Sequence, residues 1–148
     1  MKRLSVFLPI VSVTVLGGCA QFKPETWTNR GPATMEASDT GLLYCHEDAN
    51  IIDGERMVGT LCSALTSGFF MHGEPEIKFG PWNRKFMSAL ASETTKGIER
   101  DYEGKRVFLK CTPVLGGSSR TEIGRDCSVS VDEQHLVSAK FIFKKEGS

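Results

Sequence analysis

Cysteine thiols have the most versatile chemistry of the side chains in this sequence, because they can be acylated, oxidised to disulfides or deprotonated to bind a metal. The chain has 148 residues and five cysteines. Cys19 lies at the end of an apolar run near the N-terminus, whereas the other four follow at widely spaced positions, Cys45, Cys62, Cys111 and Cys127. The single cysteine and the group of four therefore need separate explanations.

The sequence that leads to Cys19 has the features of an export signal. Lys2 and Arg3 precede an apolar run over residues 4–16, and two glycines separate that run from the cysteine. A basic start, a short apolar stretch and small residues at its end are typical of a secretory signal. With its Leu16-Gly17-Gly18-Cys19 ending, this region (1–21) resembles the signal and lipobox of bacterial lipoprotein precursors.

This resemblance implies a membrane anchor and a location. The signal would be cleaved between Gly18 and Cys19, and Cys19 would carry three acyl chains, which is more than the roughly two lipid signals that stable anchoring needs. In lipoproteins of the enteric type, an Asp after the Cys favours retention in the inner membrane. Ala20 stands there instead, so we expect a lipid-anchored protein of the bacterial outer membrane, with its domain in the periplasm or on the surface.

Export also affects the interpretation of the other four cysteines. An even number of cysteines in an oxidising compartment predicts two disulfides. Three pairings are open, and we favour Cys45–Cys62 with Cys111–Cys127, because each closes a short loop, worth about 3 kcal/mol in the chain-entropy model. The alternative is a metal site built from Cys45, His46, Cys62 and His72. The close-spaced ligand pairs typical of zinc sites are absent, so we expect no metal.

Catalytic patterns are also absent from the sequence. It contains no nucleophile elbow, zinc-protease motif or phosphate-binding loop, and we place its three histidines (His46, His72 and His135) in loops. The carboxylates Glu99, Asp101 and Glu103 would share one face of a strand, where charges on an exposed edge explain them better than acid–base catalysis does. We therefore expect a protein that is not an enzyme and has no cofactor.

Composition and the positions of prolines and glycines indicate the domain organisation. The chain has 18 basic and 18 acidic residues, which argues against a nucleic-acid-binding protein. We expect a signal peptide at 1–18, a lipidated N-terminus and flexible tether at 19–40, where prolines and glycine interrupt regular structure, and a single domain at 41–148.

Hydrophobic spacing predicts two amphipathic helices in the first half of this domain. Apolar residues recur at steps of one, three and four after Asp53, at Met57, Val58, Leu61, Cys62, Leu65 and Phe69. A second helix would begin at Pro81, continue through Trp82, Phe86 and Leu90, and end near Gly97.

After Gly97 the apolar period changes to two, which predicts strands. Alternation covers 107–112, 123–132 and 137–144, and an earlier hairpin would turn at Glu103-Gly104. Helices followed by strands indicate an α+β fold, with two amphipathic helices packed on a small antiparallel sheet.

A second resemblance concerns residues 42–70. The stretches Leu42-Leu43-Tyr44-Cys45 and Cys62 to Gly68 are similar to segments of small periplasmic immunity proteins that neutralise type VI secretion amidase toxins. This resemblance implies a helical protein that inhibits a toxin.

These observations favour a non-enzymatic, outer-membrane-anchored factor that binds or assembles another envelope protein. An inhibitor or immunity protein that blocks a toxin or hydrolase is the alternative, and an envelope hydrolase with an unrecognised site is a second alternative. Large aromatic side chains dominate interface energetics, so our candidates for partner contact are Phe70 and Trp82.

The anchor leads to the first prediction. Cys19→Ala removes the only thiol that the lipobox can present for acylation, so the variant should lose acyl labelling and leave the membrane fraction. Labelling with a radioactive fatty acid and membrane fractionation measure both effects. Unchanged labelling and fractionation of the variant would contradict the assignment.

Overall fold

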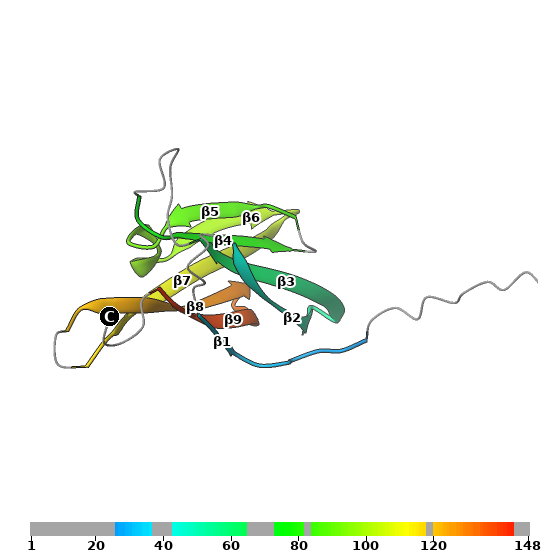
Figure 1. Ribbon diagram of the computed structural model, residues 1–148. Coiled ribbons are helices and arrows are strands. Elements are labelled where there is room, and N and C mark those ends of the chain that lie inside the picture. The colour runs from blue at the N-terminus through cyan, green and yellow to red at the C-terminus, as the bar shows by residue number, and fades with distance from the viewer. Residues whose placement is uncertain (1–25, 37–42, 65–72, 82–83, 118–119, 144–148) are drawn as a thin grey trace, which may run out of the picture.

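The computed structural model describes residues 26–36, 43–64, 73–81, 84–117 and 120–143. In these residues the chain forms nine strands and one short 3₁₀ helix (Figure 1). The elements are, in chain order, β1 (Ala33–Glu36), β2 (Tyr44–Ile52), β3 (Glu55–Ala64), β4 (Glu76–Pro81), β5 (Met87–Leu90), η1 (Glu93–Thr95), β6 (Ile98–Tyr102), β7 (Lys105–Leu115), β8 (Glu122–Val131) and β9 (Gln134–Ile142).

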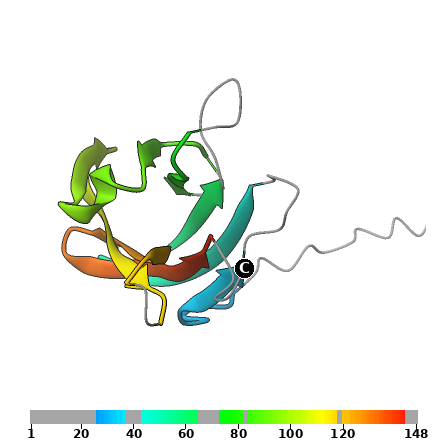
Figure 2. The same cartoon turned by 60° about the vertical axis from the view of Figure 1, so that its left-hand side comes forward.

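The strands form two sheets. One has five strands in the order β1-β9-β8-β7-β6, and the other has four in the order β2-β3-β4-β5. Every neighbouring pair is antiparallel except β1 and β9, which run parallel. Figure 2 shows the strands curving around one shared interior.

Apolar side chains from both sheets fill this interior. Leu61 and Phe79 of the four-stranded sheet and Leu109, Val129 and Phe141 of the five-stranded sheet are all fully buried in one cluster. The sheets approach so closely at Gly59 that a Cβ atom there would lie 2.9 Å from Leu136. A larger residue where β3 crosses β9 would therefore have to displace the Leu136 side chain.

The predicted α+β class is wrong, because the described residues contain no α-helix. Strand β3 occupies residues of the first predicted helix. Two adjacent residues of this strand, Met57 and Val58, are both buried. A strand buried on both faces does not alternate between apolar and polar residues, so its spacing imitated a helix.

The second predicted helix is likewise replaced by β5 and η1. Phe86 and Leu90 are four residues apart, a step that fits one face of a helix but also one face of a strand, because four is a multiple of two. Met87 and Ala89 are buried and Ser88 is exposed, which is the strand pattern.

The antiparallel sheet predicted after Gly97 is present as β6 to β9. The hairpin between β6 and β7 turns at Glu103 and Gly104, both with positive φ. Both disulfides are present with the favoured pairing, Cys45–Cys62 and Cys111–Cys127.

Part of the expected tether belongs to the folded domain. Residues 26–36, here called the N-terminal strap, end in β1, where Ala33 lies opposite Ala139 of β9. The buried carboxylate of Asp48 accepts hydrogen bonds from the backbone N–H groups of Arg30 at 2.8 Å and Gly31 at 3.0 Å. This carboxylate therefore ties the strap to β2.

None of the described segments forms a helix with the length and apolar character that crossing a bilayer requires.

The strap leads to the second prediction. Asp48→Asn replaces one carboxylate oxygen with an N–H donor that faces the strap's own donors, so the free energy of unfolding should fall by about 1–3 kcal/mol. Amide hydrogen exchange at Arg30 and Gly31 should accelerate. Asp126→Asn changes an exposed carboxylate of β8 and serves as the control. Equal exchange rates in the two variants would contradict this role of Asp48.

Candidate functional site: a groove beside the first disulfide

A groove of about 350 Å³ lies on the outer face of the four-stranded sheet. Leu61 and Phe79 are paired across β3 and β4 and point into the core. Their neighbours Cys62 and Lys78 are also paired. Because successive side chains of a strand point to opposite faces, Cys62 and Lys78 point to the outer face. The groove is lined by Leu43, Cys45, Thr60, Cys62, Lys78, Phe79, Gly80, Arg84 and Lys85.

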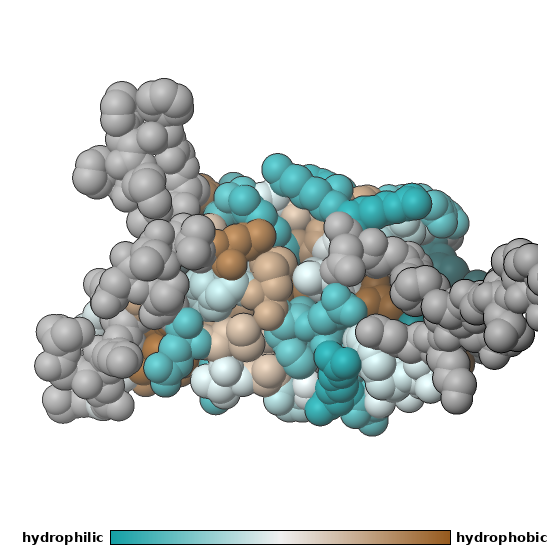
Figure 3. All heavy atoms as spheres, turned by 45° about the vertical axis from the view of Figure 1, so that its right-hand side comes forward, coloured by the Kyte–Doolittle hydropathy of each residue, from teal (hydrophilic) through white to brown (hydrophobic). Residues whose placement is uncertain are grey.

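The Cys45–Cys62 disulfide forms part of the groove's apolar surface. The two cysteines lie directly opposite each other in the β2–β3 ladder, with Cα atoms 4.0 Å apart. Cys45 is exposed, whereas Cys62 is only 7% exposed. Leu43, which is 48% exposed, adds aliphatic surface to the same groove. Figure 3 shows a face of the molecule on which apolar surface is bordered by strongly polar residues.

A tight reversal of the chain after β4 places two of the cations in this lining. The N–H of Arg84 donates to the carbonyl of Pro81 at 2.9 Å, and the N–H of Phe86 donates to the carbonyl of Phe79 at 3.1 Å. A Cβ atom on Gly80 would lie only 1.4 Å from the carbonyl oxygen of Arg84. Glycine at this position therefore allows the chain to fold back and bring Arg84 and Lys85 to the groove.

The groove has a positive rim. Lys78 is paired with Glu76 at 3.0 Å, while Arg84 and Lys85 are exposed and have no ion-pair partner among the described residues. Partial burial favours the neutral form of Glu76, but hydrogen bonds from Ser88 and Lys78 and the charges of Lys78 and Lys85 outweigh it. The pKa of Glu76 is therefore lowered, and its carboxylate neutralises only part of the rim.

The remaining cysteines and candidate contact residues lie elsewhere. Cys111 and Cys127 face each other across β7 and β8 and are fully buried in the core, so their disulfide serves the fold. Cys19, Phe70 and Trp82 lie outside the described residues.

The described residues contain no group of three or more side chains that could hold a metal ion. His46 and His135 lie on β2 and β9, which corrects their predicted placement in loops, and His72 is outside the described residues. Nε2 of His46 is 3.0 Å from the carbonyl oxygen of Gly31. This histidine therefore contacts the strap.

The alternating carboxylates lie on and just after an edge strand, as their interpretation required. Glu99 and Asp101 are exposed on β6, the last strand of the five-stranded sheet, and Glu103 is exposed in the following turn. Charged side chains on such an edge oppose pairing with another sheet.

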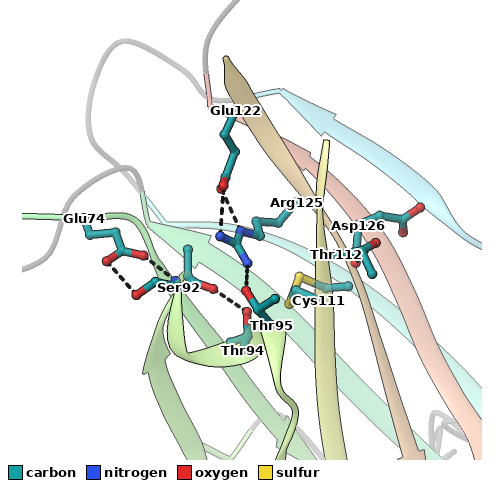
Figure 4. Close-up of polar contacts among 11 residues, drawn as sticks. Glu74, Ser92, Thr94, Thr95, Cys111, Thr112, Glu122, Arg125 and Asp126 are labelled. Carbon is teal, nitrogen blue, oxygen red and sulfur yellow. Dashed lines mark hydrogen bonds and ion pairs between the residues drawn. A yellow bond between two sulfur atoms is a disulfide. The ribbon is translucent and has the colours of Figure 1, made fainter. Parts of the chain in front are cut away.

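A second polar cluster surrounds the buried guanidinium of Arg125, which is 5% exposed (Figure 4). Its Nε and Nη2 donate to the two carboxylate oxygens of Glu122 at 2.7 and 2.9 Å, and its Nη1 donates to Oγ1 of Thr95 at 2.5 Å. A buried cation needs such partners. Because protein groups occupy both sides of the guanidinium, we interpret the cluster as a structural link between β8 and η1.

The arginine cluster and the groove each correspond to a feature of the sequence. Arg125 interrupts the apolar face of the alternating segment 123–132, which is a signal for a paired buried charge. Lys78, Arg84 and Lys85 flank the Gly80-Pro81 break, but a few cations near a turn are usual on protein surfaces. Only the chain reversal at Gly80 shows that they share a groove.

Comparisons of this chain with protein-family models, curated proteins and solved structures give no match.

The arginine cluster leads to the third prediction. Glu122→Gln leaves the Arg125 charge buried without its anion and should lower the free energy of unfolding by about 1–3 kcal/mol, less than for a fully buried pair because Glu122 is partly exposed. Adding Arg125→Met removes the stranded charge, so the double variant should be more stable than Glu122→Gln alone. Urea unfolding of the wild type, Glu122→Gln, Arg125→Met and the double variant measures this coupling. Additive losses would contradict the pairing.

Proposed function

We propose that this chain is a lipid-anchored protein of the bacterial outer membrane whose domain binds another envelope protein and catalyses no reaction. The lipobox at Cys19 supports the location. The groove beside Cys45–Cys62 supports the binding role, and it is the observation on which the proposal rests.

The chemistry of the groove indicates the kind of segment that it takes. Its disulfide and Leu43 offer apolar surface, on which an aromatic or aliphatic side chain of the partner can be buried as an anchor. Lys78, Arg84 and Lys85 surround this surface with positive charge. An acidic segment with an apolar side chain at its centre matches both properties, because complementary charges select the partner and accelerate association.

The size of the groove agrees with this kind of ligand. Its volume of about 350 Å³ lies at the lower end of the roughly 300–1,000 Å³ found for ligand pockets. The groove can therefore take a few side chains of a partner, and neighbouring surface would supply the rest of a stable interface.

Groove variants test the proposal and give the fourth prediction. The detergent-extracted, full-length protein is used as bait in envelope extracts, captured proteins are identified by mass spectrometry, and affinity for the purified partner is then measured. Leu43→Ser and the double variant Arg84→Glu/Lys85→Glu should each weaken binding by about tenfold or more, as expected for anchor positions.

Two matched variants serve as controls. Leu115→Ser alters another exposed leucine, 57% exposed at the end of β7, and Lys110→Glu reverses an exposed charge on the same strand. Both should bind like the wild type. Equal affinity of the groove variants and these controls would contradict the proposal, as would a reaction catalysed by the purified domain. The identity of the captured protein distinguishes an assembly factor from an inhibitor.

A further inference from the structure

The two disulfides differ in their access to solvent. Cys111 and Cys127 are 0% exposed and lie inside the core. In the other disulfide, Cys45 is exposed and lines the groove, while Cys62 lies deeper on the neighbouring strand. A dissolved thiolate can therefore reach Cys45 in the folded protein, whereas the buried disulfide requires unfolding first.

Three cations line the groove around the exposed disulfide, and one of them, Lys78, is paired with Glu76. Lys78 lies directly opposite Cys62 in the β3–β4 ladder, and Arg84 and Lys85 line the same groove. Positive charge near a cysteine stabilises its thiolate, and a more stable thiolate is a better leaving group in disulfide exchange. The same charge attracts an anionic thiol.

The strand ladder can hold the fold together when this disulfide opens. Strands β2 and β3 are paired from Tyr44–Ser63 to Ile52–Glu55. The Cys45–Cys62 pair lies next to the last pair of this ladder, at the end away from the turn. Most of the ladder therefore remains between the disulfide and the turn after reduction.

From these features we infer that Cys45–Cys62 is a site of thiol–disulfide exchange with anionic thiols. The incoming thiolate attacks Sγ of Cys45 and forms a mixed disulfide with it, the Cys45–Cys62 bond breaks, and Cys62 leaves as a thiolate beside Lys78. A second thiolate then attacks the sulfur of the first thiol in the mixed disulfide. This step releases the Cys45 thiolate and a disulfide of the two small thiols, which are oxidised as the protein is reduced. The inference does not depend on the groove's binding a protein partner.

Glutathione and cysteamine provide the test, because the first is anionic and the second carries a cationic amine. The oxidised full-length protein with Cys19→Ala, which removes the fifth thiol, is treated with each compound under native conditions, quenched in acid, alkylated and mapped by mass spectrometry. Glutathione should first appear on Cys45 with Cys62 alkylated, while Cys111–Cys127 stays oxidised. Relative to the urea-unfolded protein, glutathione should be favoured over cysteamine by about threefold or more.

Charge variants identify the source of this preference. Lys78→Gln and, independently, Arg84→Ala/Lys85→Ala should each slow the reaction with glutathione by about threefold or more relative to that with cysteamine. The leaving Cys62 thiolate is common to both reactions, whereas attraction of an anionic thiol is lost only for glutathione. Lys110→Ala, an exposed cation of β7, should change neither rate. Circular dichroism melting confirms that each variant is folded.

Three results would overturn the inference. They are opening of both disulfides at one common rate, a first adduct on Cys62, and the same rates in the groove variants as in Lys110→Ala. Failure of partner binding in the oxidised protein would instead contradict only the proposed function, so the two outcomes are separable.

Discussion

Apolar contact between the inner faces of the two sheets holds the domain together, because no helix of the described residues covers either sheet. This contact fixes the position of every strand. Gly59 lets β3 approach Leu136, and the Cys111–Cys127 disulfide is packed inside the same cluster. The side chains of the inner faces therefore stabilise the fold. The proposed binding and thiol-exchange sites lie on an outer face, where the four-stranded sheet carries the groove.

The second half of the fold could be predicted from the sequence because β7 and β8 each have one buried face. Val107, Leu109 and Cys111 alternate with exposed residues, and a period of two identifies a strand directly. The first half could not be predicted in this way. Buried residues on both faces of β3 remove the alternation, and the pairing of distant strands that causes this burial is not visible in a local window.

The site shows the same division between local and distant information. The disulfide pairing could be predicted because each cysteine pair closes a short loop. The position of Arg125 on an apolar face signals that it is buried. Its partner Thr95, however, is separated from it in the sequence by β6 and β7. The groove is even harder to predict from the sequence. It requires Leu43 on one side of β3 and Arg84 on the other, which only the sheet order brings together.

The N-terminal strap would set the distance between the domain and a membrane in the proposed lipid-anchored protein. With lipid on Cys19, as proposed above, only the six residues from Ala20 to Glu25 separate the anchor from the start of the strap at Thr26. Fully extended, such a segment spans at most about 20 Å. A flexible tether over all of 19–40, as expected from the sequence, would allow a much larger distance between the domain and the membrane. With the proposed anchor, the strap would confine the domain to a thin layer beside the bilayer, and the domain would meet a partner by diffusing along the membrane surface.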